Sequence, residues 1–200
     1  MLVYRFAEYE YEYERRSVHG FSQGNAPEEL ATGALTLLFG THESSDFWGD
    51  CLKRWWEVVR SQHHKIRRLQ IYLNNGPKNS GRRTQFLKRI VEFSDWSGLE
   101  IRLVYYPPYH SKYNPIERCW SSLQKKWNGV LLTCWQVVRL CASRMTWKRQ
   151  HPSIVLMEGN YPTGVIVPKQ EMNEINRRLI RSETLPSYDI LIMPKRPRGR

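Results

Sequence analysis

Short apolar runs alternate with amphipathic helical patterns along the middle of the chain, and this order strongly limits how the chain can fold. Three runs have the length and composition of buried strands, at 34–39, 69–73 and 101–105. Patterns with helical spacing follow them, at 47–59, 84–96 and 115–127. The order strand, helix, strand, helix, strand, helix predicts an α/β layer whose parallel strands are joined by helical crossovers.

The pattern is weaker on both sides of this middle part. Residues 9–14 alternate Tyr with Glu, which is the period of a strand, and residues 17–33 have the composition of a loop. Towards the C-terminus the sequence predicts a helix over 135–147, a short strand over 165–167, a polar helix over 169–181 and a basic tail. We therefore divide the chain into an unassigned segment 1–33, a core 34–147 and a C-terminal extension 148–200.

Two polar loops follow the second and third predicted strands. The first reads NNGPKNSGRR over 74–83, and the second reads YPPYHSKYNPIER over 106–118. Functional groups collect at the carboxyl ends of strands in open α/β sheets, so we expect both loops at one edge. Their cations, amides and hydroxyls are the residue types that contact phosphate groups.

The charge of the chain points to a polyanionic partner. Lys and Arg number 31 against 19 Asp and Glu, which gives a net charge of +12 and an isoelectric point near 9.7. Such an excess favours nucleic acid and, less often, an anionic membrane surface. No apolar run approaches the ~20 residues of a membrane span, and residues 1–8 do not resemble a signal peptide, so we expect a cytoplasmic, nucleoid-associated protein without membrane contact. The four cysteines lack zinc-ligand spacing and are expected to be reduced thiols.

Two long motifs carry a resemblance to a known family. The segments YPPYHSKYNPIERCW and LNNGPKNSGRRTQFLKRIVEF resemble signatures of DDE transposases of the mariner-related insertion-sequence group (ISAzo-type). The resemblance covers about 34–147 and extends weakly toward Lys169. It implies an RNase H-like fold, with a mixed sheet flanked by helices, here expected to lack the first strands because the chain looks truncated at its N-terminus.

The resemblance also implies the chemistry of a DDE enzyme. Members of this family cleave and rejoin DNA with two Mg²⁺ ions held by three carboxylates, because in-line attack on a phosphodiester needs both the nucleophile and the leaving oxygen stabilised. The implied partners are DNA, as transposon ends and target, and an intact transposase in a homo- or hetero-oligomer.

Only some of the three catalytic acids of the family have a counterpart in this sequence. The third acid matches Glu117, the second falls on Asn74, and the first has no matching segment. An amide is neutral and binds Mg²⁺ more weakly than a carboxylate. We therefore expect a partial transposase that is inactive by itself, with Glu117 and Asn74 as the remaining metal and catalytic positions.

Other residues of the two motifs are candidates for contact with DNA. They are Lys78, Arg82 and Arg83 in the first loop and His110, Lys112 and Arg118 in the second. Structural interpretations compete with these roles. Glu117 also suits the third position of a helix capped by Asn114, and Asn-Asn-Gly-Pro over 74–77 is ordinary turn chemistry. Trp55, Trp56, Trp120 and Trp127 recur at helical spacing and are expected in the core.

Three functions remain open from the sequence. The first is a catalytically defective DDE transposase. The alternative is a non-catalytic remnant that binds DNA or an intact transposase and acts as a regulator. The third, which the two motifs disfavour, is a basic α/β RNA-binding protein unrelated to transposition.

Overall fold

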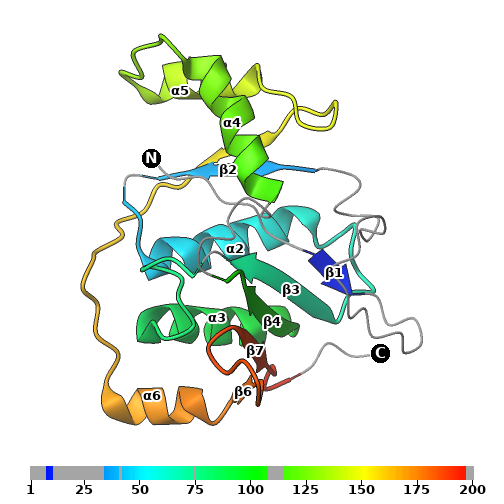
Figure 1. Ribbon diagram of the computed structural model, residues 1–200, viewed down its shortest axis with the longest axis vertical. Helices are drawn as coiled ribbons and strands as arrows, with labels where there is room; N and C mark the ends of the chain where they lie inside the picture. Colours follow the sequence, from blue (N-terminus) through cyan, green and yellow to red (C-terminus); the bar gives the residue numbers. More distant parts are fainter. Residues whose placement is uncertain (1–7, 11–33, 41, 74, 108–114, 197–200) are drawn as a thin grey trace.

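A computed structural model describes residues 8–10, 34–40, 42–73, 75–107 and 115–196, with the side chains of 8–10, 115–118 and 120 outside the description. Two parts can be distinguished in Figure 1: a five-stranded mixed sheet with its helices, and a smaller lobe that carries α4 and α5. The α/β class expected from the sequence is confirmed at this level.

The main sheet has the strand order β1-β3-β4-β7-β6. The bounds are Glu8–Glu10 for β1, Arg68–Leu73 for β3, Glu100–Tyr105 for β4, Asp189–Ile192 for β7 and Leu179–Arg181 for β6. Strands β3 and β4 are parallel, and the other neighbouring pairs are antiparallel. The connection between β3 and β4 runs through α3 (Thr84–Ser97), which ends where Gly98 adopts a φ of 72°. This strand–helix–strand unit is the crossover that the sequence predicts.

One face of the main sheet forms the larger core. Alternate residues of β3 and β4 are buried, and they pack against α2 (Ser45–Val59), α3 and α6 (Lys169–Asn176). The side chain of Ser44 caps α2 by accepting a hydrogen bond of 3.2 Å from the backbone N–H of Phe47. Trp55 and Trp56 on α2 are buried, as their spacing predicts.

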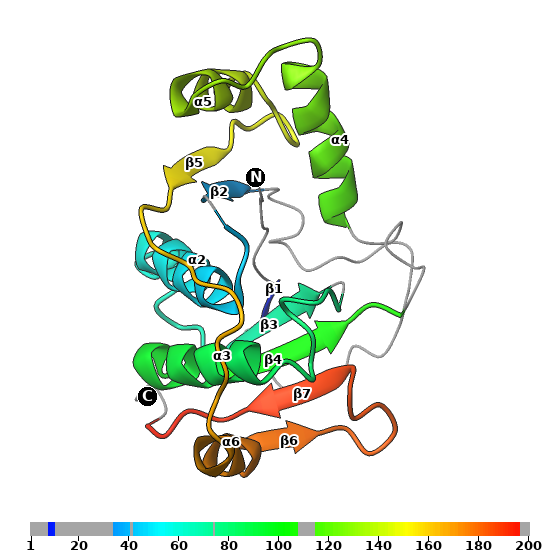
Figure 2. The same cartoon turned by 90° about the vertical axis from the view of Figure 1, so that its left-hand side faces the viewer.

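The smaller lobe has its own core. Strand β2 (Thr36–Phe39) pairs in parallel with β5 (Ser153–Leu156), and α4 (Pro115–Trp127) and α5 (Trp135–Ser143) belong to the same lobe (Figure 2). Leu37 and Phe39 pack in this second core, whereas Leu38 belongs to the core of the main sheet. Strand β2 is therefore buried on both sides and lies between the two cores.

Several expectations of secondary structure are wrong. The strand predicted over 34–39 forms as β2, but it pairs with β5 in a separate two-stranded sheet, where its two faces contact the two cores. Residues 165–167 form no strand, although Val167 is buried in the core. The helix predicted over 169–181 ends at Asn176, and Leu179–Arg181 form β6 instead.

The region after residue 148 contributes to both sheets. It supplies β5 to the lobe and β6 and β7 to the main sheet. The helix predicted over 135–147 ends at Ser143, because Trp147 instead pairs with Gln150 in an isolated β-bridge. All four cysteines are thiols, as expected, and Cys134 is the exposed one. No helix in the described part of the chain is long and apolar enough to cross a membrane.

Candidate functional site

The carboxyl ends of β3 and β4 meet at one edge of the main sheet. The two strands are parallel and in register to their last residues, Leu73 and Tyr105, and the N–H of Tyr106 donates a hydrogen bond of 2.8 Å to the carbonyl of Leu73. Figures 1 and 2 both place the start of α4 on the side of the sheet where these strands end. Glu117 is the third residue of α4. The two segments that carry the motifs thus approach the same edge.

Five of the eight predicted site residues lie outside the description, either entirely or by their side chains. Asn74, His110 and Lys112 belong to the parts of the chain that the structure does not describe, and so do the side chains of Glu117 and Arg118. Lys78, Arg82 and Arg83 are described. The separation of the Asn74 and Glu117 side chains therefore stays a prediction.

The loop 75–83 connects β3 to α3 and is folded on itself. Asn75 has a φ of 53°, a left-handed conformation that Asn tolerates better than most residues. The N–H of Asn79 donates to the carbonyl of Gly76 at 3.2 Å, and the N–H of Arg83 donates to the carbonyl of Ser80 at 2.9 Å. The turn that the sequence predicts at this point is present.

Three other elements fix this loop. The hydroxyl of Ser45 on α2 donates to the carbonyl of Lys78 at 2.9 Å, and the phenol of Tyr105 on β4 donates to the carbonyl of Asn79 at 2.9 Å. The guanidinium of Arg181 on β6 donates to the carbonyl of Gly81 at 3.1 Å. Burial raises the pKa of Tyr105 above its ordinary value, so the phenol remains a protonated donor. The loop is thus attached to α2, β4 and β6 through its backbone.

The three described cations lie on this fixed loop. Arg82 is exposed, and its guanidinium donates to the hydroxyl of Ser187 at 3.4 Å. Arg83 is half-buried immediately before α3, and its Nε has no acceptor among the described residues. Lys78 is half-buried, with its carbonyl bound by Ser45. A rigid backbone that presents Lys and Arg side chains suits contacts with phosphate oxygens.

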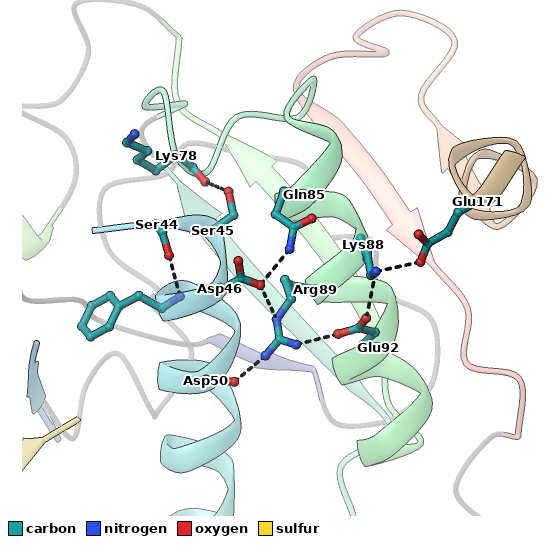
Figure 3. Close-up of polar contacts among 11 residues, drawn as sticks. Ser44, Ser45, Asp46, Asp50, Lys78, Gln85, Lys88, Arg89, Glu92 and Glu171 are labelled. Carbon is teal, nitrogen blue, oxygen red and sulfur yellow. Dashed lines mark hydrogen bonds and ion pairs between the residues drawn. The ribbon is translucent and has the colours of Figure 1, made fainter. Parts of the chain in front are cut away.

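An ion-pair network on α2 and α3 was not anticipated from the sequence (Figure 3). The guanidinium of Arg89 contacts carboxylates of Asp46 at 3.5 Å, Glu92 at 2.7 Å and Asp50. Asp46 also accepts a hydrogen bond of 2.8 Å from the amide of Gln85. The spacing of Arg89 and Glu92 on one helix is readable from the sequence, whereas the contacts across to α2 depend on how the helices pack.

A separate ion pair joins α3 to α6. The ammonium of Lys88 lies 2.8 Å from a carboxylate oxygen of Glu171 and 4.0 Å from Glu92. The hydrogen bond with Glu171 raises the pKa of Lys88. This pair fixes the position of α6 beside α3, away from the edge where β3 and β4 end.

The described residues do not fit a divalent metal site. Among the side chains of the described part, no three His, Cys, Asp or Glu come together as metal ligands. The carboxylates of Asp46, Asp50 and Glu92 converge on the guanidinium of Arg89, which occupies the place of a cation. At the sheet edge, Asn75 has a buried Oδ1 with no hydrogen-bond partner among the described residues, but this oxygen is neutral. The described side chains therefore do not supply the ligands of a catalytic metal.

Comparison with known protein families finds a match over most of the chain. A family model described as Rhodopirellula transposase DDE domain matches residues 13–194. The matched range extends beyond 34–147, the part that carries the resemblance noted in the sequence, at both ends. No curated protein and no solved structure matches the chain.

Proposed function

The chain belongs to the DDE transposase family described from Rhodopirellula, and from this membership we propose that it is a DNA-binding transposase of the mariner-related group that does not cleave DNA by itself. The family model covers most of the chain, and the family acts on DNA with divalent metal. Of that activity, this chain is proposed to retain the binding of DNA and to lack cleavage.

An RNase H-like arrangement is part of the proposal. The parallel pair β3 and β4 with its α3 crossover, in a mixed sheet whose antiparallel strands lie on both sides, supports it. So does the approach of α4 to the edge where these two strands end. In such an arrangement, Asn74 directly after β3 and Glu117 in the first turn of α4 are the metal-binding positions.

The identity of residue 74 is the observation that carries the proposed loss of activity. Asn74 directly follows β3, at the position where the motif of the family has an aspartate. An amide contributes no negative charge, and the first acid has no assigned residue in this chain. Removing one central group of a catalytic site commonly costs several orders of magnitude in rate. Mg²⁺ would therefore be held chiefly by Glu117, with less charge than the reaction needs.

Binding to DNA does not depend on these missing charges. Lys78, Arg82 and Arg83 lie on the fixed loop 75–83 and are proposed to contact phosphate groups. His110, Lys112 and Arg118 are proposed to act in the same way from the second motif. A chain that binds DNA but does not cut it would act as a regulator by competing with, or joining, an intact transposase. A cytoplasmic, nucleoid-associated location follows from this proposal.

A nicking assay on supercoiled plasmid DNA tests the proposal. The wild type and Glu117→Gln are compared with Mg²⁺ and with Mn²⁺, and retention of the plasmid is measured in the same samples. We expect retention that falls steeply with salt and no nicking by either protein. Metal-dependent nicking by the wild type that Glu117→Gln abolishes would show an active enzyme. Absence of retention at low salt would contradict the proposed DNA binding.

A further inference from the structure

Several arginines around the main sheet pair with carboxylates, whereas the stretch that builds most of the smaller lobe contains no Asp or Glu. Around the main sheet, Arg89, Arg102 and Arg178 each contact at least one carboxylate. From residue 118 to residue 157 the sequence contains no Asp or Glu, but it contains seven Lys and Arg. This stretch spans most of α4, all of α5 and β5. The lobe is therefore strongly basic without carboxylates of its own.

The packing of α4 and α5 turns these cations outwards. Helix α4 buries Cys119 and Leu123 against the lobe core, and Lys125 and Lys126 in its last turn are exposed. Helix α5 likewise buries one face, and it exposes Arg139 and the C-cap residue Arg144. None of these four cations forms an ion pair with a residue of the described part.

A tight turn after α5 adds two more cations. Trp147 and Gln150 exchange backbone hydrogen bonds of 2.8 and 2.9 Å, which leaves Lys148 and Arg149 as the two central residues of the turn. Their φ values are 45° and 66°. Two positive φ values match a type I′ turn, which favours Asn and Gly over residues with long side chains. The turn thus holds two exposed basic side chains where backbone preference alone would not place them.

The chemistry of this face matches a phosphate backbone. The exposed residues of α4, α5 and their connection include donors with hydroxyl or amide groups, namely Ser121, Gln124, Asn128 and Gln136. Protein–DNA contacts to phosphate use Lys, Arg, Ser, Asn and Gln in this way. Leu131 and Leu140 are also exposed, with 83% and 52% of their surface accessible, and would suit a protein partner instead. The excess of exposed positive charge in a stretch without Asp or Glu favours DNA.

We propose that the outward face of the lobe is a second DNA-backbone interface, separate from the loop 75–83. The face is defined by six residues, called the lobe cations: Lys125, Lys126, Arg139, Arg144, Lys148 and Arg149. The inference rests on the proposed function, because it takes DNA as the partner. It adds that the lobe, and not only the sheet edge, supplies affinity.

The length of α4 separates Lys125 and Lys126 from the first turn of that helix. Its 13 residues span about 20 Å at 1.5 Å per residue. The first turn of α4 lies on the side of the sheet where β3 and β4 end, while Lys125 and Lys126 lie in its last turn. About 20 Å corresponds to roughly six base pairs of duplex. The lobe would therefore hold DNA that flanks the segment at the sheet edge.

The test measures the affinity of the full chain for a fluorescent duplex of arbitrary sequence across a range of salt concentrations. The lobe variant combines four changes: Lys125→Gln, Lys126→Gln, Arg139→Gln and Arg144→Gln. A control removes the same number of exposed cations elsewhere: Arg60→Gln, Lys65→Gln, Lys169→Gln and Arg177→Gln. The slope of log K against log salt is negative, and each lost phosphate contact should reduce its steepness by about 0.9. We expect the steepness to fall by roughly 3 to 4 for the lobe variant and by clearly less for the control.

A turn variant separates a binding role from a structural one. Replacing Lys148 by Asn and Arg149 by Gly gives the turn the residues that its positive φ values favour. We expect this variant to melt at the same or a higher temperature than the wild type, while its affinity for the duplex falls several-fold. A protein whose turn cations are merely structural would gain stability without losing affinity, and that result would overturn the role of the turn.

Three other outcomes would contradict the lobe interface, and they show whether the proposed function fails with it. If Lys78→Gln, Arg82→Gln and Arg83→Gln together abolish binding while the lobe variant binds like the control, the lobe interface is wrong and the proposed function stands. If the wild type does not bind the duplex even at low salt, both are wrong. A lobe variant that keeps its DNA affinity but loses self-association in sedimentation would assign the face to a protein partner.

Discussion

The buried phenol of Tyr105 donates a hydrogen bond of 2.9 Å to the backbone carbonyl of Asn79. This bond joins the last residue of β4 to the middle of the loop that follows β3, two segments 26 residues apart in the chain. Through it, the position of the basic loop depends on the sheet edge itself. The Tyr105–Asn79 hydrogen bond thus helps to position Lys78, Arg82 and Arg83 for their proposed DNA contacts, although none of the three takes part in it.

Replacing Tyr105 by Phe should lower the free energy of unfolding by about 1 to 3 kcal/mol, because a buried hydrogen bond loses its donor. Urea unfolding measures the change, and DNA affinity measured at fixed salt should fall as the loop loosens. Tyr188→Phe is a matched control, since its half-buried phenol forms no hydrogen bond in the described part of the chain. Equal stability of the Tyr105 and Tyr188 variants would contradict the role assigned to this bond.

Replacing Arg89 by Met should destabilise the packing of α2 against α3. The change leaves the carboxylates of Asp46, Asp50 and Glu92 without their shared cation. These groups are partly exposed, so we expect a loss of about 1 to 3 kcal/mol, below the cost of breaking a fully buried pair. Because repulsion between the carboxylates is screened by salt, thermal melts should show a smaller loss at 1 M salt.

Arg54→Met supplies the control for this network. Arg54 pairs with Glu57 alone among the described carboxylates, at 3.4 Å, and both side chains are about half exposed. We expect a change within about 0.5 kcal/mol for this surface pair. If the Arg89 and Arg54 variants unfold at the same denaturant concentration, the three-carboxylate network contributes no more than an ordinary surface ion pair.

The stability of the chain should fall in acid through Asp95. Burial opposes ionisation of this carboxyl, but two hydrogen bonds of 2.6 Å from Arg178 and one of 2.8 Å from the Lys195 N–H outweigh it, and the pKa of Asp95 lies below its ordinary value. A lowered pKa adds stability that is complete above the unfolded pKa of about 3.9 and is lost as the pH falls through the folded pKa.

Asp95→Asn tests this dependence. At pH 7 the variant should unfold more easily than the wild type, by about 1 to 3 kcal/mol, and the difference should shrink as the pH falls below 3.9. Melting temperatures recorded across this pH range measure both effects, with Glu57→Gln as a control carboxylate. A constant difference between variant and wild type at every pH would contradict the role of the ionised carboxylate.

Restoring a carboxylate at residue 74 should raise the affinity for metal without restoring catalysis. We expect Asn74→Asp to bind Mn²⁺ at least about tenfold more tightly than the wild type, which corresponds to roughly 1.4 kcal/mol. Calorimetric titration measures the affinity, and Asn75→Asp is the adjacent control. Plasmid nicking by the Asn74→Asp protein would show either that two acids suffice or that this chain supplies the first acid.

The sequence by itself determined the elements whose signal is local. The apolar runs of β3 and β4 and the helical stripe of α3 lie in one continuous stretch, so their parallel pairing follows from the crossover rule. The turn after β3 and the buried Trp55 and Trp56 are local in the same sense. The two motifs that carry the resemblance are likewise contiguous sequence, and the family to which they point, DDE transposases, is confirmed by the match over residues 13–194.

Only the tertiary structure decided how distant segments combine. Strand β2 pairs with β5 more than a hundred residues later, and β7 joins β4 from near the end of the chain. No local pattern predicts such partners, because a strand's pairing depends on which apolar surfaces remain uncovered once the helices have packed. The same reason hides the Tyr105–Asn79 bond and the exposure of the lobe cations on α4, on α5 and in the turn after α5. The residue types of a segment determine its secondary structure and which of its faces is buried, whereas tertiary packing determines which distant segment covers that face.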